Sequence, residues 1–343
     1  MEHPPNIYEQ QKRNHRATIL MVTLFVLFFC CLGYGFDLFY LGVDPFGVVG
    51  ESRYPFPLAT IFALVVTSTM AAWSWQSGAK AVLTSAHVFP VPENEEKYHM
   101  LRNVVDEMAI ASGLPTPRLY IVPDPDPNAF ATGRDPEHSY IAVTEGLLAA
   151  LNREELQAVI GHEMSHIRNH DTRLMMVVAA LVGGILLLAD WTLRFMRFGG
   201  TRGGIGGGRR RSRGGGPLAL MLFVIWLVAI ALAPIVSRLL AVAVSRKREY
   251  LADASGAELT RNPLALANAL TKIASAEAPT KSIKKGTAHL CIADPLGRSI
   301  NAKEGFLAEL FGTHPPMSKR ITLLKAMAYQ YQQSSATMNS AQA

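Results

Sequence analysis

Apolar and polar segments alternate along this chain, and the first two apolar runs are long enough to cross a membrane. Residues 17–36 and 54–79 contain no charged side chain, and a helix needs about 20 apolar residues to span a bilayer. The first run exceeds the core of a signal peptide and no small-residue cleavage site follows it, which favours an uncleaved anchor. The second run contains Trp73 and Trp75 near its end, where tryptophan commonly marks the membrane surface.

Two further apolar runs, residues 174–189 and 217–237, flank a segment rich in Gly and Arg at residues 199–216. The second of these runs is a clear candidate span, whereas the first has only 16 residues before Asp190. If both cross, the arginines lie outside the cell, against the tendency of positive loops to stay inside. The pair therefore either crosses twice or forms a hairpin that does not fully cross, and both cases leave its flanks on one side.

Between the two pairs of apolar runs, residues 80–173 have the mixed pattern of a soluble α+β unit. Apolar positions in residues 93–112 recur at helical spacing. Residues 118–122, 128–133 and 139–144 are predicted as strands separated by turn-forming residues.

Beyond residue 238 the chain is polar again, and helical spacing predicts helices at residues 249–259 and 263–275. The polar residues after position 329 predict a disordered end. The expected divisions are an N-terminal arm with two transmembrane helices (1–79), a first catalytic part (80–173), a hydrophobic hairpin with its Gly/Arg-rich loop (174–243), a second catalytic part (244–330) and a disordered tail (331–343).

Composition and charge narrow the class of protein further. A hydrophobic content of 49% indicates a membrane protein. The net charge of +6 is concentrated locally, so we expect no nucleic-acid partner. The Gly/Arg segment could bind RNA or anionic lipid, but a disordered spacer is the favoured interpretation. Lys12, Arg13 and Arg16 beside the first apolar run predict a cytoplasmic N-terminus. The three cysteines form neither a disulfide framework nor a zinc-binding spacing.

The chemistry is concentrated in a predicted helix that carries H-E-x-x-H. Asn152, followed three residues later by Glu155, is a capping-box pattern, and the helix is expected to continue to residue 173. His162 and His166 then project from one face, where two imidazoles can bind one zinc ion. Glu163 beside them can take a proton from the bound water. The alternative is a solvated helix with two ordinary surface histidines.

A catalytic zinc needs a third protein ligand. His170 is excluded on a continuous helix, because it lies about 12 Å from His162 along the axis. Among the downstream glutamates, only Glu249 has an aspartate four residues later, Asp253. On a helix the two share a face, so Glu249 could bind the metal while Asp253 holds a ligand histidine. A charged helical face beside the membrane is the alternative.

The stretches H-E-M-S-H, S-R-K-R-E-Y-L-A-D, T-H-P-P-M-S-K-R-I and N-A-F-A-T-G together resemble the M48 peptidase family. Within that family the chain is most similar to the HtpX-type membrane proteases. The resemblance implies an α-helical multi-pass membrane protein with an α+β zincin catalytic domain of the gluzincin type. The N-terminal arm and the Gly/Arg loop have no counterpart that we can match.

The resemblance also assigns roles to residues of this chain. It implies one Zn²⁺ per chain, with His162, His166 and Glu249 as ligands, Glu163 as general base and Asp253 as partner of a ligand histidine. His314 and Arg320 are implied near the cleft, as contacts of the oxyanion or the substrate. An extended substrate would add to a strand edge formed by Asn128, Ala129, Phe130, Ala131, Thr132 and Gly133.

The expected function is a zinc endopeptidase of the cell (inner) membrane, with its catalytic domain in the cytoplasm. The resemblance implies polypeptide substrates, above all damaged or misfolded membrane proteins, and hence a role in protein quality control. Two alternatives remain at this stage. One is a processing protease for prenylated proteins, and the other is a membrane scaffold or transporter with a structural metal.

Overall fold

The computed structural model describes residues 7–43, 56–177, 221, 224–228, 231, 248–276, 290–293 and 315–342. The chain separates into two compact units. The first unit contains residues 1–17, 75–179 and 239–343, and the second contains residues 18–74 and 180–238. The first unit therefore includes both segments predicted to form a catalytic domain, 80–173 and 244–330.

Two long helices supply the apolar segments near the N-terminus. Helix α1 (Ile7–Phe36) continues into a short π-helix, and α2 (Leu58–Ser85) follows. By length and composition, residues 14–39 and 58–85 could each cross a membrane. The second helix begins inside the charge-free run 54–79, after Pro57, because proline disfavours a helical conformation in the residue before it. The apolar runs 174–189 and 217–237 lie largely outside the described residues.

A buried carboxylate fixes the start of α2 within the second unit. Asp37 is fully buried and accepts hydrogen bonds from the backbone N–H of Ala59 at 2.9 Å and of Thr60 at 2.8 Å. The hydroxyl of Thr60 donates a third bond at 2.7 Å. Because the first N–H groups of a helix have no partner within it, this carboxylate satisfies donors that would otherwise be unpaired.

The first unit contains a four-stranded sheet with the order β1-β2-β4-β3. The strands are β1 (Phe89–Pro90), β2 (Arg118–Val122), β3 (Ala129–Gly133) and β4 (Ser139–Thr144). Strands β2 and β4 are parallel, whereas β3 runs antiparallel to β4 and forms one end of the sheet. The three predicted strands are confirmed, and β3 starts one residue later than predicted.

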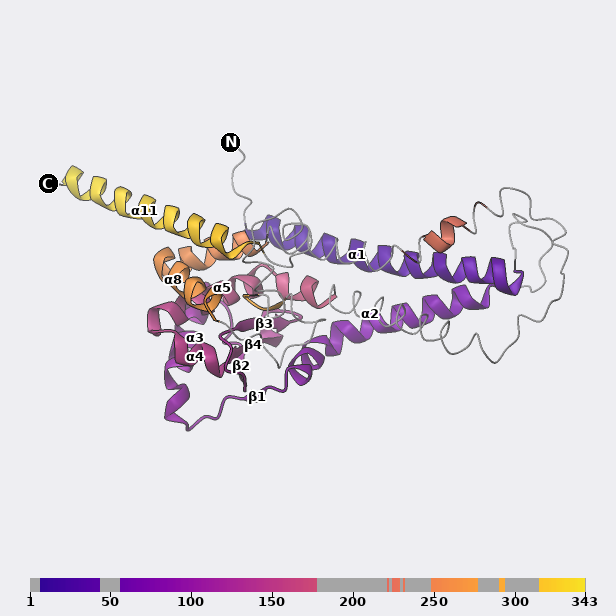
Figure 1. Ribbon diagram of the computed structural model, residues 1–343, viewed down its shortest axis with the longest axis horizontal. Helices are drawn as coiled ribbons and strands as arrows, with labels where there is room; N and C mark the ends of the chain where they lie inside the picture. The colour runs from indigo at the N-terminus through magenta and orange to yellow at the C-terminus, as the bar shows by residue number, and fades with distance from the viewer. Residues whose placement is uncertain are drawn as a thin grey trace. The chain divides into compact units, whose positions relative to one another are not determined.

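Further helices belong to the same unit as this sheet (Figure 1). They are α3 (His99–Ser112), α4 (Glu145–Ala150), α5 (Arg153–Arg168), α8 (Pro263–Ala274) and α11 (Met317–Gln342). A further helix covers residues 248–260. The main apolar core joins α3, α5 and α8 through buried side chains, among them Leu101, Leu156, Ile160, Leu266 and Leu270. Burying each such side chain contributes about 1.5–3 kcal/mol.

Three sequence predictions about helix boundaries were wrong. The helix predicted from residue 93 begins at His99, after a turn at residues 93–94 and a short 3-10 helix. Helix α5 ends at Arg168 rather than at residue 173. The predicted disordered tail is helical to Gln342, because the segment contains neither Gly nor Pro to interrupt α11.

Candidate active site

The helix that carries H-E-x-x-H is capped and buried. The side chain of Asn152 accepts from the N–H of Glu155 at 2.9 Å, and Glu155 accepts from the N–H of Asn152 at 2.9 Å, which completes the capping box. His162 and His166 are only 0% and 5% exposed. This burial excludes the alternative of a solvated helix with two surface histidines.

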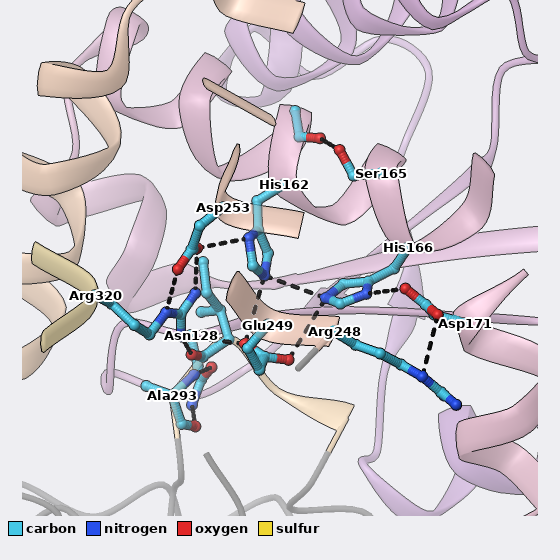
Figure 2. A network of polar contacts seen from close by, with 12 residues as sticks. Asn128, His162, Ser165, His166, Asp171, Arg248, Glu249, Asp253, Ala293 and Arg320 are labelled. Atoms are coloured by element: carbon cyan, nitrogen blue, oxygen red, sulfur yellow. Dashed lines mark hydrogen bonds and ion pairs between the residues drawn. The ribbon is translucent and has the colours of Figure 1, made fainter. Parts of the chain in front are cut away.

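Three side chains from two helices converge on one point (Figure 2). The Nε2 atoms of His162 and His166 lie 3.2 Å apart. The carboxylate of Glu249, from the helix over residues 248–260, lies 3.7 Å from Nε2 of His162 and 3.6 Å from Nε2 of His166. Within the part of the chain that the structure describes, this is the only group of three side chains whose potential ligand atoms all lie within 4.8 Å.

Glycines at the crossing of these two helices allow this convergence. A Cβ atom on Gly256 would lie 2.8 Å from the backbone nitrogen of His162 and 2.9 Å from its Cα. Gly161 faces the same crossing, where a Cβ would lie 3.3 Å from the carbonyl oxygen of Gly256. Gly256 follows Glu249 by seven residues, so both lie on one helical face. The absence of a side chain at Gly256 therefore lets Glu249 approach the two histidines.

Asp253 and Arg320 hold this side of the site. Oδ1 of Asp253 lies 3.0 Å from Nδ1 of His162, so the ring presents its other nitrogen to the centre. Arg320 donates two hydrogen bonds to Asp253, at 2.7 and 2.6 Å, and one to the carbonyl oxygen of Ile292 at 2.8 Å. Its Nη1 also lies 3.2 Å from Oε2 of Glu249.

Charge pairing outweighs burial in this cluster. Burial opposes the positive charge of Arg320, but the carboxylates of Asp253 and Glu249 raise its pKa above the ordinary value. Burial likewise opposes the charge of Asp253, yet the guanidinium of Arg320 lowers the pKa of that carboxyl. Arg320 is 0% exposed, and its contacts are those of a residue that positions two carboxylates. The predicted contact of Arg320 with a substrate stays a prediction.

A second carboxylate, Asp171, holds His166. Its Oδ2 lies 3.1 Å from Nδ1 of His166, and its Oδ1 lies 3.4 Å from Nε of Arg248. Burial favours the neutral ring, but the hydrogen bond to Asp171 and the charge of Glu249 raise the pKa of His166 to about 9. Each histidine of the pair thus has its own carboxylate partner on Nδ1.

Sequence reasoning missed Asp171 because it assumed a continuous helix. Five residues after His166, an aspartate on that helix would point about 140° away from it. In the structure, α5 ends at Arg168 and His170 has a positive φ of 57°. Asn169 and His170 are weak helix formers, and the turn they make brings Asp171 back to His166. The only sequence signal is a carboxylate shortly after the motif helix.

Glu163 is buried, and its carboxylate could act as a base. The residue is 1% exposed, and neither carboxylate oxygen has a hydrogen-bond partner among the described residues. Burial raises the pKa of Glu163, although positive charge on His162 and His166 would lower it. The backbone N–H of Ala131 also lowers this pKa, although its geometry falls short of a hydrogen bond. That contact places Glu163 beside strand β3.

Strand β3 contains most of the N-A-F-A-T-G stretch, and part of its edge is covered by residues 290–293. The N–H of Ile292 donates to the carbonyl oxygen of Ala129 at 2.9 Å, and Phe130 forms a bridge with Cys291. The side chain of Asn128 donates to the carbonyl oxygen of Ala293 at 3.0 Å. His314, predicted near the cleft, lies outside the described residues.

The donor set fits a catalytic metal ion. Two imidazole nitrogens and one carboxylate are the ligands of many catalytic zinc sites. Each imidazole has a carboxylate next to its other nitrogen, at 3.0 Å in His162 and 3.1 Å in His166, which is the usual support of metal-binding histidines.

Comparison with known proteins agrees with this geometry. Residues 95–328 match the model of peptidase family M48. "Protease HtpX homolog" of Caldanaerobacter subterraneus subsp. tengcongensis is 42% identical over 94% of this chain and 98% of its own length. The protein of that name from Dictyoglomus turgidum is 40% identical over 94% of this chain and 96% of its own length.

Among solved structures, Ste24p from S. mikatae aligns with a TM-score of 0.46 and 17% identity. The alignment covers 79% of this chain and 59% of that one, and this likeness is too weak to support an inference. The family match extends over more than half of the chain and includes all three converging side chains. The chain therefore belongs to peptidase family M48 and is a metalloprotease.

Proposed function

We propose that this protein is a zinc endopeptidase of the cell membrane that cuts damaged or misfolded membrane proteins on the cytoplasmic side. The observation that carries the proposal is the convergence of His162, His166 and Glu249 next to the buried carboxylate of Glu163. A purely structural metal site would not need an acidic group beside its ligands, so this arrangement favours an enzyme over a scaffold or transporter.

His162, His166 and Glu249 would hold the zinc ion. Bound there, zinc would supply Lewis acidity that polarises the scissile carbonyl group and acidifies water. Glu163 would accept a proton from the attacking water and deliver it to the leaving amine. Its raised pKa supports this role, because a base that returns its proton works best when its pKa is near the working pH.

The substrate is proposed to lie along the edge of β3. Strand β3 ends the sheet, and the N–H of Ala131 bears on the charge of Glu163. An extended peptide that paired with this edge would therefore lie next to Glu163, the proposed base. Residues 290–293 already pair at Ala129 and Phe130. We infer that the substrate uses the part of the edge from Ala131 to Gly133.

Charge and connectivity support the proposed cytoplasmic location. Lys12 and Arg13 precede the first candidate span and Arg16 lies in its first turn, and positive flanks stay in the cytoplasm. Residues 1–17 belong to the same compact unit as the site. The two candidate spans between them return the chain to the side on which it began, which supports a site facing the cytoplasm.

Replacing the proposed base tests this function. Glu163→Gln removes the proton acceptor but keeps the shape of the side chain, so we expect unchanged zinc content and a loss of proteolysis of about 10²–10⁴-fold. The assay is cleavage of an unfolded protein such as casein by the full-length protein in detergent, with and without a chelator.

Glu154→Gln is the matched control, because this glutamate is exposed on the same helix. The control should retain full activity. Full activity in Glu163→Gln, or a wild-type protein whose activity survives complete removal of zinc, would refute the proposal.

A further inference from the structure

A side chain from the N-terminal arm reaches the carboxylate that supports one of the proposed ligands. The amide nitrogen of Asn14, in α1, donates to Oδ1 of Asp171 at 2.8 Å and to the carbonyl oxygen of Asn169 at 2.7 Å. Both partners are acceptors, so only the NH₂ group, with its two donors, can serve them. The contact joins residues that are 157 positions apart in the sequence.

The two acceptors lie on either side of an unfavourable turn. His170 between them has a φ of 57°, a left-handed conformation that a residue with a side chain adopts only when its surroundings hold it. This turn directs Asp171 back toward His166, whose Nδ1 is 3.1 Å from Oδ2 of the carboxylate. Asn14 donates hydrogen bonds to both Asn169 and Asp171. These bonds stabilise the turn that fixes the position of the Asp171 carboxylate.

We propose that Asn14 is a positioning residue for the metal site, acting through Asp171 on the orientation of the His166 ring. The inference rests on the proposed function, because it takes His166 as a zinc ligand. Removing the partner of a ligand histidine typically changes metal affinity by about 10–100-fold. Arg248 lies 3.4 Å from Asp171 and would remain its partner in a variant that lacks Asn14, so we expect the lower end of that range.

Zinc release from the full-length protein in detergent provides the test. Asn14→Ala should release zinc to a chelator about tenfold faster than the wild type. The absorption bands of Co²⁺ bound in place of zinc should also change, because they report the geometry of the ligands. Arg16→Lys is the matched control, since Arg16 is exposed on the same helix and the substitution keeps its charge, and it should leave both readouts unchanged.

Pairing the substitutions separates positioning from a general effect on folding. If Asn14 acts through Asp171, adding Asn14→Ala to Asp171→Ala, which removes the acceptor, should cause no further loss of zinc affinity. Asn14→Asp should be worse than Asn14→Ala, because it places two carboxylates together. Combining Asn14→Asp with Asp171→Asn should partly restore affinity, since the new amide can donate to the new carboxylate.

The outcomes distinguish this inference from the proposed function. A wild-type protein that holds no zinc would overturn both. A wild-type protein that holds zinc, with equal release rates in Asn14→Ala, would overturn only the role of Asn14. Additive losses in the double variant, or no recovery in the exchanged pair, would also overturn it.

Discussion

The glycine at the helix crossing offers the sharpest test of how this site is assembled. In Gly256→Ala the new Cβ would lie 2.8 Å from the backbone nitrogen of His162, whereas ordinary contacts begin at 3.4 Å. The obstacle is backbone rather than the end of a flexible side chain, so the helices themselves must separate by about 0.6 Å. Glu249 lies on the same helix and moves with it.

Two effects of opposite sign decide the magnitude. Alanine is a better helix former than glycine by about 1 kcal/mol, which favours the variant. Overpacking a close contact costs about 1–3 kcal/mol, which opposes it. We therefore expect a net loss of up to about 2 kcal/mol in the free energy of unfolding. Metal sites tolerate ligand displacements of only about 0.2 Å, so zinc affinity should fall by at least about tenfold.

Zinc titration and denaturant unfolding measure both quantities. Ser255→Ala is the control, because it changes the adjacent position without entering the crossing. It should leave the stability and the zinc affinity near those of the wild type. If Gly256→Ala proves more stable than the wild type and binds zinc equally well, the close approach of the two helices is not needed for the site.

Three other predictions follow from the contacts of the site. Arg320→Met removes the guanidinium that pairs with two buried carboxylates, Asp253 and Glu249, and should destabilise the protein by about 3–5 kcal/mol in denaturant unfolding. Protons compete with zinc for His166, whose pKa is about 9, so affinity measured by titration should fall about tenfold per pH unit below 9. Asn152→Ala removes the helix cap and should lower stability by about 1 kcal/mol, with unchanged zinc affinity.

Much of the architecture could be predicted from local pattern alone. Residues 118–122 and 139–144 form the predicted strands, and the capping box at Asn152 starts the predicted helix. Helical spacing placed His162 and His166 on one face. These features depend on neighbouring residues in the chain, because strand alternation, helical periodicity and capping are all short-range properties.

The identity of the third proposed ligand, Glu249, could be predicted from the sequence only in part. An aspartate four residues later singled it out, and the structure brings Glu249 to the two histidines. The sequence did not indicate that Gly256 makes this approach possible. A glycine inside a helix has no visible purpose until the helix that crosses it is known.

The sequence by itself determined the paired histidines, the adjacent glutamate, the strands and the apolar helices, because each follows from the order of nearby side chains. Tertiary structure alone decided which groups surround them. Asp171 reaches His166 only because α5 ends early, and Arg320 is buried against Asp253 although 67 positions separate them. Such contacts depend on how helices pack against one another and where they end, and the spacing of residues along the chain does not predict either.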